Sequence, residues 1–115
     1  MLKLIVVIVS VDKTDELIET ARKAGATGAT VIHEVRGEGL KASKTFLGLD
    51  FSAVRDAILF VAADNSAQDI MNAIQESAGF DENPGSGIAF QLSIEDAVGL
   101  RSQMPYILES MDDDT

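Results

Sequence analysis

The chain has 115 residues, a length typical of one domain that can bury a single hydrophobic core. It contains no cysteine, which excludes disulfide bonds, thiolate metal sites and catalysis by a cysteine nucleophile. The formal net charge of −10 disfavours nucleic acid and anionic membranes as general partners, so an anionic ligand would have to be bound at a local site.

The chain opens with an apolar stretch that predicts a β-strand. Residues Leu2–Val9 form a nearly continuous run of β-branched and apolar residues, typical of a strand covered on both faces. The run is too short to span a bilayer, and Asp12 follows it without a small-residue cleavage pattern. We therefore expect a first strand, no insertion into a membrane, and a cytoplasmic protein.

After Thr14 the apolar residues recur every three or four positions, which predicts a helix. Gly25 supplies a signal for the end of this helix. The apolar stripe consists of Leu17, Ile18, Ala21 and Ala24.

Residues 29–36 alternate in the manner of a second strand, which ends at the glycines Gly37 and Gly39. His33 is the only histidine, and it shares a strand face with two valines. We interpret it as a core or subunit-interface residue and not as a metal site, because one histidine does not make a ligand set.

The second half of the chain begins with a third buried strand over Ala57–Ala62, followed by a second helix that ends at Gly79. Ser66 and Asp69 have the spacing of a capping box and predict the start of this helix. Its apolar stripe consists of Ala67, Ile70, Met71, Ile74 and Ala78. A turn at residues 80–86 then leads to a fourth strand over Gly87–Leu92.

The two halves repeat one another. Asp12 and Thr14 have counterparts in Asp64 and Ser66, and both helices end in Ala-Gly. Two βαβ units in tandem predict an α+β, ferredoxin-like βαββαβ fold, with two helices on one face of a four-stranded antiparallel sheet. The other face is apolar and the chain offers no third helix to cover it, so we expect copies of the chain to associate.

We assign residues 1–101 to this domain and residues 102–115 to an acidic C-terminal tail. Part of the tail has the pattern of a surface helix, and its apolar residues would dock on a neighbouring subunit. The aspartates at its end are interpreted as solvated.

Two stretches, GATGATVIHEVRGEG at residues 25–39 and PGSGIAFQLSIEDAVGLR at residues 84–101, resemble the PII signal-transduction family. The resemblance extends from Leu2 to Arg101. Within the family, the sequence is most similar to the shorter PII-like members. It implies a homotrimer whose sheets face inward and which binds an adenine nucleotide (AMP, ADP or ATP) in the clefts between subunits. It also implies regulation of a membrane transporter or metabolic enzyme through residues 40–50, without catalysis and without a metal.

The resemblance also implies which residues bind the nucleotide. Glycines let main-chain amides approach phosphate oxygens, and an arginine adds charge-assisted hydrogen bonds. The implied residues are Thr30 near the adenine, Gly37, Glu38 and Gly39 after the second strand, Gly85, Ser86 and Gly87 before the fourth, and Arg101 after it.

This sequence departs from the family at two of its basic positions. Ile88 stands where the family commonly has a lysine, and Gly99 replaces a second arginine. Each lost charge-assisted contact would cost about 1.5–3 kcal/mol, so the nucleotide is predicted to bind weakly. The tyrosine that some members carry in the loop is absent, since the only tyrosine is Tyr106.

The loop Leu40–Asp50 is expected to be mobile without a partner, because it has few apolar anchors. A local positive patch is predicted around it from Arg36, Lys41, Lys44 and Arg55.

Two other functions stay open: a trimeric scaffold without nucleotide binding, and a sensor of another small metabolite such as an amino acid, bicarbonate or a cation. No spacing marks a nucleophile with its base, so an enzyme is not expected. The sequence does not name the ligand or the partner protein.

Overall fold

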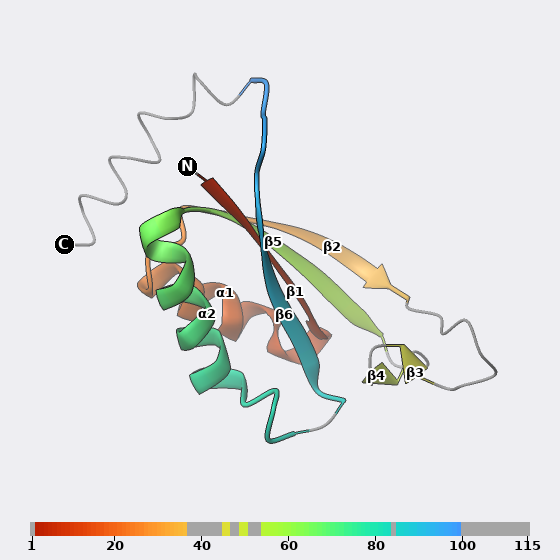
Figure 1. The fold of residues 1–115 in the computed structure, drawn as a ribbon. Coiled ribbons are helices and arrows are strands. Elements are labelled where there is room, and N and C mark those ends of the chain that lie inside the picture. Colours follow the sequence, from red (N-terminus) through yellow and green to blue (C-terminus); the bar gives the residue numbers. More distant parts are fainter. Residues whose placement is uncertain (1, 37–44, 47–48, 51–53, 84, 100–115) are drawn as a thin grey trace.

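The computed structural model describes residues 2–36, 45–46, 49–50, 54–83 and 85–99. Its centre is a four-stranded sheet in the order β2-β5-β1-β6, in which every neighbouring pair is antiparallel (Figure 1). The strands are β1 (Leu2–Ser10), β2 (Ala29–Val35), β5 (Arg55–Ala63) and β6 (Gly87–Ser93). This order and direction confirm the ferredoxin-like fold predicted from the repeat.

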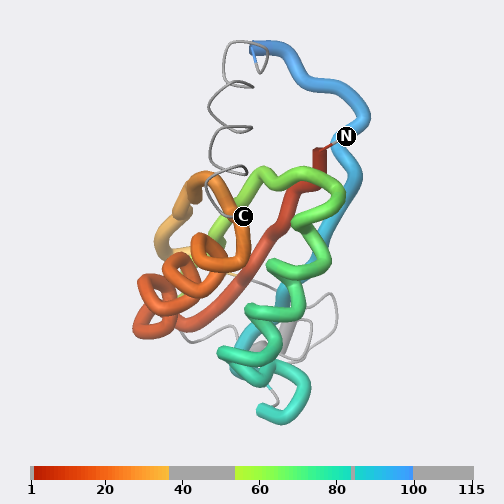
Figure 2. The backbone as a smooth tube through the Cα atoms, turned by 90° about the vertical axis from the view of Figure 1, so that its left-hand side faces the viewer, coloured from red at the N-terminus to blue at the C-terminus, as the bar shows by residue number. Residues whose placement is uncertain are grey.

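Both helices cover the same face of the sheet, as Figure 2 shows from the helix side. Helix α1 spans Thr14–Lys23, and a short 3-10 helix, η1 (Val11–Lys13), leads into it. Helix α2 spans Asp64–Ala78. It ends at Gly79, whose φ of 61° is left-handed and whose N–H donates to the Gln75 carbonyl at 2.8 Å.

The core lies between the helices and the sheet. Alternate residues of β1 and β5 point toward the helices, because successive side chains of a strand face opposite sides. Among the described residues, the fully buried large apolar side chains are Ile5, Val7, Val9, Leu17, Ile58, Phe60, Ile70 and Ile74.

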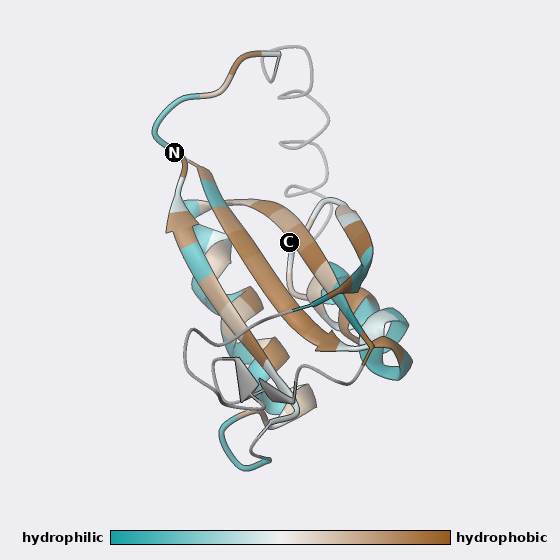
Figure 3. Cartoon of the chain, turned by 90° about the vertical axis from the view of Figure 1, so that its right-hand side faces the viewer, coloured by the Kyte–Doolittle hydropathy of each residue, from teal (hydrophilic) through white to brown (hydrophobic). Residues whose placement is uncertain are grey.

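The opposite face of the sheet, here called the open face, is also apolar. Figure 3 looks onto this face and shows strands β1 and β5 mostly in hydrophobic colours. Ile32, Phe90 and Leu92 are 47%, 37% and 46% exposed in the single chain. The prediction that one sheet face is apolar and is not covered by α1 or α2 is therefore confirmed for the described strands.

The strand register brings four strand ends to one edge of the sheet. Arg55, at the start of β5, pairs with Ser10 at the end of β1 and with Val35 at the end of β2. Gly87, at the start of β6, pairs with Val9. The end of β2 and the start of β6 therefore lie at the same edge, which is marked by Ser10, Val35, Arg55 and Gly87 and which we call the glycine edge.

Three details differ from the sequence-based expectations. The prediction of a capping box at Ser66 and Asp69 is wrong. Helix α2 begins at Asp64, directly after β5, with Ala63 at its N-cap and no side-chain cap. Strand β5 also begins at Arg55, ahead of the apolar run. Two further short strands, β3 (Thr45–Phe46) and β4 (Leu49–Asp50), pair within the predicted loop.

Parts of the chain to which the sequence analysis assigned a role lie outside the described residues. They include most of the loop Leu40–Asp50 and the tail at residues 102–115. No helix in the described part of the chain is long and apolar enough to cross a membrane.

The packing of Gly87 generates a prediction about stability. A Cβ atom at this position would lie 2.5 Å from Phe80 Cε1 and 2.8 Å from the Ile8 carbonyl oxygen. We expect Gly87→Ala to lower the free energy of unfolding by about 1–3 kcal/mol through overpacking, measured by urea denaturation. Gly28→Ala is the control, because its Cβ would meet nothing within 4 Å. Equal unfolding midpoints for the two variants would contradict the argument.

Candidate functional site

The segment Gly85–Gly87 forms one side of the candidate site, at the glycine edge. Gly85 has a φ of 80°, a left-handed backbone conformation that residues other than glycine rarely adopt. Gly87 leaves room for the Phe80 ring. Each glycine thus has a structural reason to be there, and the Ser86 N–H already donates to the Asn83 carbonyl at 3.1 Å.

Arg55 reaches this segment from the start of β5. Its Nη2 donates to the Gly85 carbonyl at 2.9 Å, and its Nη1 to the Ser86 carbonyl at 3.4 Å. The residue is only 7% exposed although it carries a charge. The prediction that Arg55 contributes to a positive patch around the loop is therefore wrong: its guanidinium is directed at the main chain before β6.

The neighbouring residue, Asp56, is buried on the helix side of the sheet and holds three elements together. It is 1% exposed. Its carboxylate accepts a hydrogen bond from Thr14 Oγ1 at 2.6 Å. It also accepts one from the ring of His33 on the neighbouring strand β2 (Nδ1 to Oδ1, 3.0 Å). A main-chain hydrogen bond from Glu34 adds to these, so the start of α1 and the end of β2 are both fastened to β5.

These contacts lower the pKa of Asp56 below its ordinary value. The hydrogen bond from Thr14 is the largest cause; burial opposes it, and the hydrogen bond and charge of His33 act in the same direction as Thr14. Glu34 has φ of 59°, and the β2–β5 register shifts between Ile32 and Val35. This β-bulge redirects the strand just before the predicted loop.

His33 differs from its prediction in part. Its side chain is 74% exposed, so it is not a core residue. A place at a subunit interface stays a prediction. No group of three or more histidine, aspartate or glutamate side chains in the described part of the chain could hold a metal ion.

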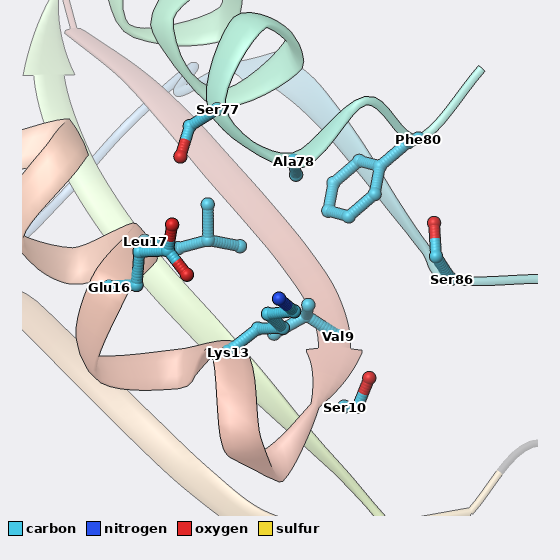
Figure 4. Close-up of a pocket in the computed structure, with 9 residues that line it drawn as sticks. All are labelled: Val9, Ser10, Lys13, Glu16, Leu17, Ser77, Ala78, Phe80 and Ser86. Atoms are coloured by element: carbon cyan, nitrogen blue, oxygen red, sulfur yellow. The ribbon is translucent and has the colours of Figure 1, made fainter. Parts of the chain in front are cut away.

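A small cavity lies on the helix side of the segment, between the start of α1, the end of α2 and the chain before β6 (Figure 4). Its volume is about 70 Å³, and Lys13, Phe80 and Ser86 are among the lining residues. The Ser86 Oγ is buried and has no hydrogen-bond partner among the described residues. A cavity of this size suits ordered water and is too small for a nucleotide.

The structure places only part of the predicted nucleotide site. Gly85, Ser86 and Gly87 lie together at the glycine edge. Thr30 is the second residue of β2 and pairs with Leu59 on the open face, away from that edge. Outside the described residues lie Gly37, Glu38, Gly39 and Arg101.

Arg55 and Asp56 have roles that were not predicted from the sequence. A signal was present: the two charged residues stand directly before the apolar run of a central strand. Charged residues are rarely buried unless they are paired or hydrogen-bonded, so their position inside the strand marks a polar anchor.

Comparison with known proteins shows the family of the chain and supports the fold. The family described as nitrogen regulatory protein P-II matches residues 2–104. The chain therefore belongs to the P-II family, whose members are signalling regulators. No curated protein matches the chain by sequence.

Solved structures share the fold at low sequence identity. CPII from Thiomonas intermedia, bound to ADP, AMP and acetate, is 19% identical with a TM-score of 0.64, covering 87% of this chain and 92% of that one. A PII-like signalling protein from Thermus thermophilus is 22% identical with a TM-score of 0.60, covering 81% and 86%. The divalent ion tolerance protein CutA1 from Ehrlichia chaffeensis is 9% identical with a TM-score of 0.70, covering 96% and 94%. A second CPII structure holds ADP and bicarbonate.

The buried carboxylate predicts a particular dependence of stability on pH. The pKa of Asp56 is lower in the folded state than its ordinary value of 3.8. Its contribution is therefore complete above about pH 4 and is lost as the pH falls through the lower folded-state pKa. We expect Asp56→Asn to lower the free energy of unfolding at pH 7 by about 1.5–3 kcal/mol, and to reduce the loss of stability between neutral and acidic pH.

Urea denaturation from pH 7 to pH 2 measures this effect. Asp69→Asn is the matched control, since Asp69 is exposed on α2. If Asp56→Asn kept the pH profile of the unmodified protein, the carboxylate would not contribute as described.

Proposed function

We propose that this P-II family member is a cytoplasmic regulator that binds an adenine nucleotide in clefts between the subunits of a trimer. It controls a transporter or a metabolic enzyme through residues 40–50, and it acts by ligand-dependent binding and not by catalysis. Residues 1–101 form the regulatory domain and residues 102–115 an acidic tail.

The observation that carries the proposal is the glycine edge. The segment Gly85–Gly87 and the end of β2 lie at the same edge of the sheet, and the chain continues from β2 into Gly37–Gly39. Both glycine segments that the family resemblance assigns to the nucleotide therefore start from one edge. A ligand bound there would contact the base of the loop that a partner reads.

The open face of the sheet supports the trimer. An exposed apolar surface on a sheet is costly, and copies of the chain can cover it. A cleft between subunits would also supply the space for a nucleotide, since the cavity at Ser86 measures only about 70 Å³. CPII, which shares the fold, was solved with ADP and AMP, and this supports an adenine nucleotide as the ligand class.

The position of Ile88 gives a reason for its departure from the family pattern. Ile88 pairs with Ile8, and both side chains belong to the open face. An isoleucine there adds to the apolar surface, whereas a lysine would add a charge for the distal phosphates. The proposed ligand is thus one that depends little on a charge at this position, such as AMP or ADP.

The nucleotide is tested by calorimetry with AMP, ADP and ATP. We expect at least one to bind with modest affinity, and Arg101→Ala to weaken it about tenfold or more through loss of charge-assisted hydrogen bonds. Arg22→Gln is the control for net charge, since Arg22 lies on α1. If none of the three binds at millimolar concentration, the nucleotide proposal fails and the scaffold or other-metabolite function takes its place.

The trimer is tested by light scattering at micromolar concentration. We expect the mass of three chains, and we expect Leu92→Glu to dissociate the trimer, because it places a charge on the open face. Val98→Glu adds the same charge at a residue that is 95% exposed and lies beyond β6, so it should leave the mass unchanged. A monomer in the unmodified protein would remove the proposal.

A further inference from the structure

We propose that Arg55 is a positioning residue for the Gly85–Gly87 segment: its buried guanidinium holds two consecutive main-chain carbonyls and keeps the segment in one shape before a ligand binds. The inference rests on the proposed function, because the segment belongs to the proposed nucleotide site. It adds a residue that the family resemblance did not indicate.

The first argument is the burial of the charge. Arg55 is 7% exposed, and burying a guanidinium is unfavourable unless its donors find acceptors. Within the described residues, its acceptors are the carbonyls of Gly85 and Ser86, and no carboxylate there forms an ion pair with it. A cation kept inside the fold with only main-chain acceptors acts on the shape of that main chain.

The second argument is the geometry of the contacts. The two Nη atoms of one planar group meet the two carbonyls at 2.9 and 3.4 Å. A guanidinium has its donors in a fixed fork, so donating to both carbonyls fixes the relative orientation of two successive peptide planes. A lysine ammonium at the same place would keep the charge but not this fork.

The third argument is that this segment needs support from outside. It follows a turn and contains two glycines, which lose the most conformational freedom when ordered. A further main-chain hydrogen bond of the segment, from Ser86 N–H to the Asn83 carbonyl, is local to the turn. Arg55 comes from β5, in the middle of the sheet, and so connects the segment to the rigid part of the fold.

The guanidinium of Arg55 also affects the electrostatics of the segment. Arg55 places a buried positive charge beside the segment, and a buried charge is less screened by salt than an exposed one. Its Nε has no hydrogen-bond partner among the described residues, so the guanidinium is not saturated. Ile88 contributes no charge, and Arg55 therefore makes this end of β6 favourable for an anionic group.

The experiment compares Arg55→Lys, Arg55→Gln and the control Arg22→Gln, which removes an equal charge from α1. Hydrogen exchange is measured at the Ser86 amide without ligand, and ADP affinity is measured by calorimetry. In both Arg55 variants we expect Ser86 exchange to be about tenfold faster or more, and ADP to bind about tenfold more weakly or worse. Arg22→Gln should change neither by more than about twofold.

The outcomes separate this inference from the proposed function. If ADP and the other nucleotides do not bind the unmodified protein, the proposed function fails, while exchange at Ser86 still decides whether Arg55 positions the segment. If Arg55→Lys exchanges and binds like the unmodified protein, the fork is unnecessary and the inference is wrong.

A measurement on the unmodified protein covers the case in which both Arg55 variants fail to fold. A guanidinium fixed on two carbonyls rotates slowly, so its Nη–H groups should give separate NMR signals. A single averaged signal for Arg55 would overturn the inference.

Discussion

The structure depends on two buried charged residues, Arg55 and Asp56, which are consecutive in the sequence and stand at the start of β5. Successive residues of a strand face opposite sides, so Asp56 points toward the helices and Arg55 away from them. Asp56 accepts hydrogen bonds from Thr14 and His33, and Arg55 donates to the carbonyls before β6. Burying these charges is costly, and the hydrogen bonds that offset the cost also fix the start of α1, the bulge in β2 and the Gly85–Gly87 segment.

This arrangement gives the glycine edge a fixed local structure. The bulge at Glu34 redirects the chain just before the segment that begins at Gly37, and the carboxylate that supports the bulge belongs to the residue next to Arg55. The bulge in β2 and the segment Gly85–Gly87 are thus anchored by neighbouring positions of one strand. The opposite end of the sheet has no comparable pair of buried charges among the described residues.

Structural similarity and the family match establish different things about this protein: the first its fold, the second its class. CutA1 superimposes with a TM-score of 0.70 at 9% identity, and CPII with 0.64 at 19% identity. Ferredoxin-like folds host unrelated functions, so similarity of this kind establishes the fold and nothing further. The P-II family match over residues 2–104 establishes the class of protein, and the ligand site at the glycine edge is our proposal.

Elements that depend on local pattern could be predicted from the amino-acid sequence alone. Periodicity located both helices and all four strands of the main sheet, and the repeat of the two halves gave their order. Gly25 and Gly79 marked the helix ends because the chain takes positive φ there, at 116° and 61°. The resemblance of residues 84–101 to one family was also readable from the sequence.

The contacts between distant side chains, in contrast, could be seen only in the folded chain. The spacing of Ser66 and Asp69 fits a capping box, but α2 begins at Asp64 because β5 runs directly into it. Arg55 looked like part of an exposed basic patch, yet it is buried against carbonyls 30 and 31 positions away. Local pattern records the period of a helix or strand. It does not indicate which distant residues folding brings together. These distant residues supply the hydrogen-bond partners that allow a charged side chain to be buried.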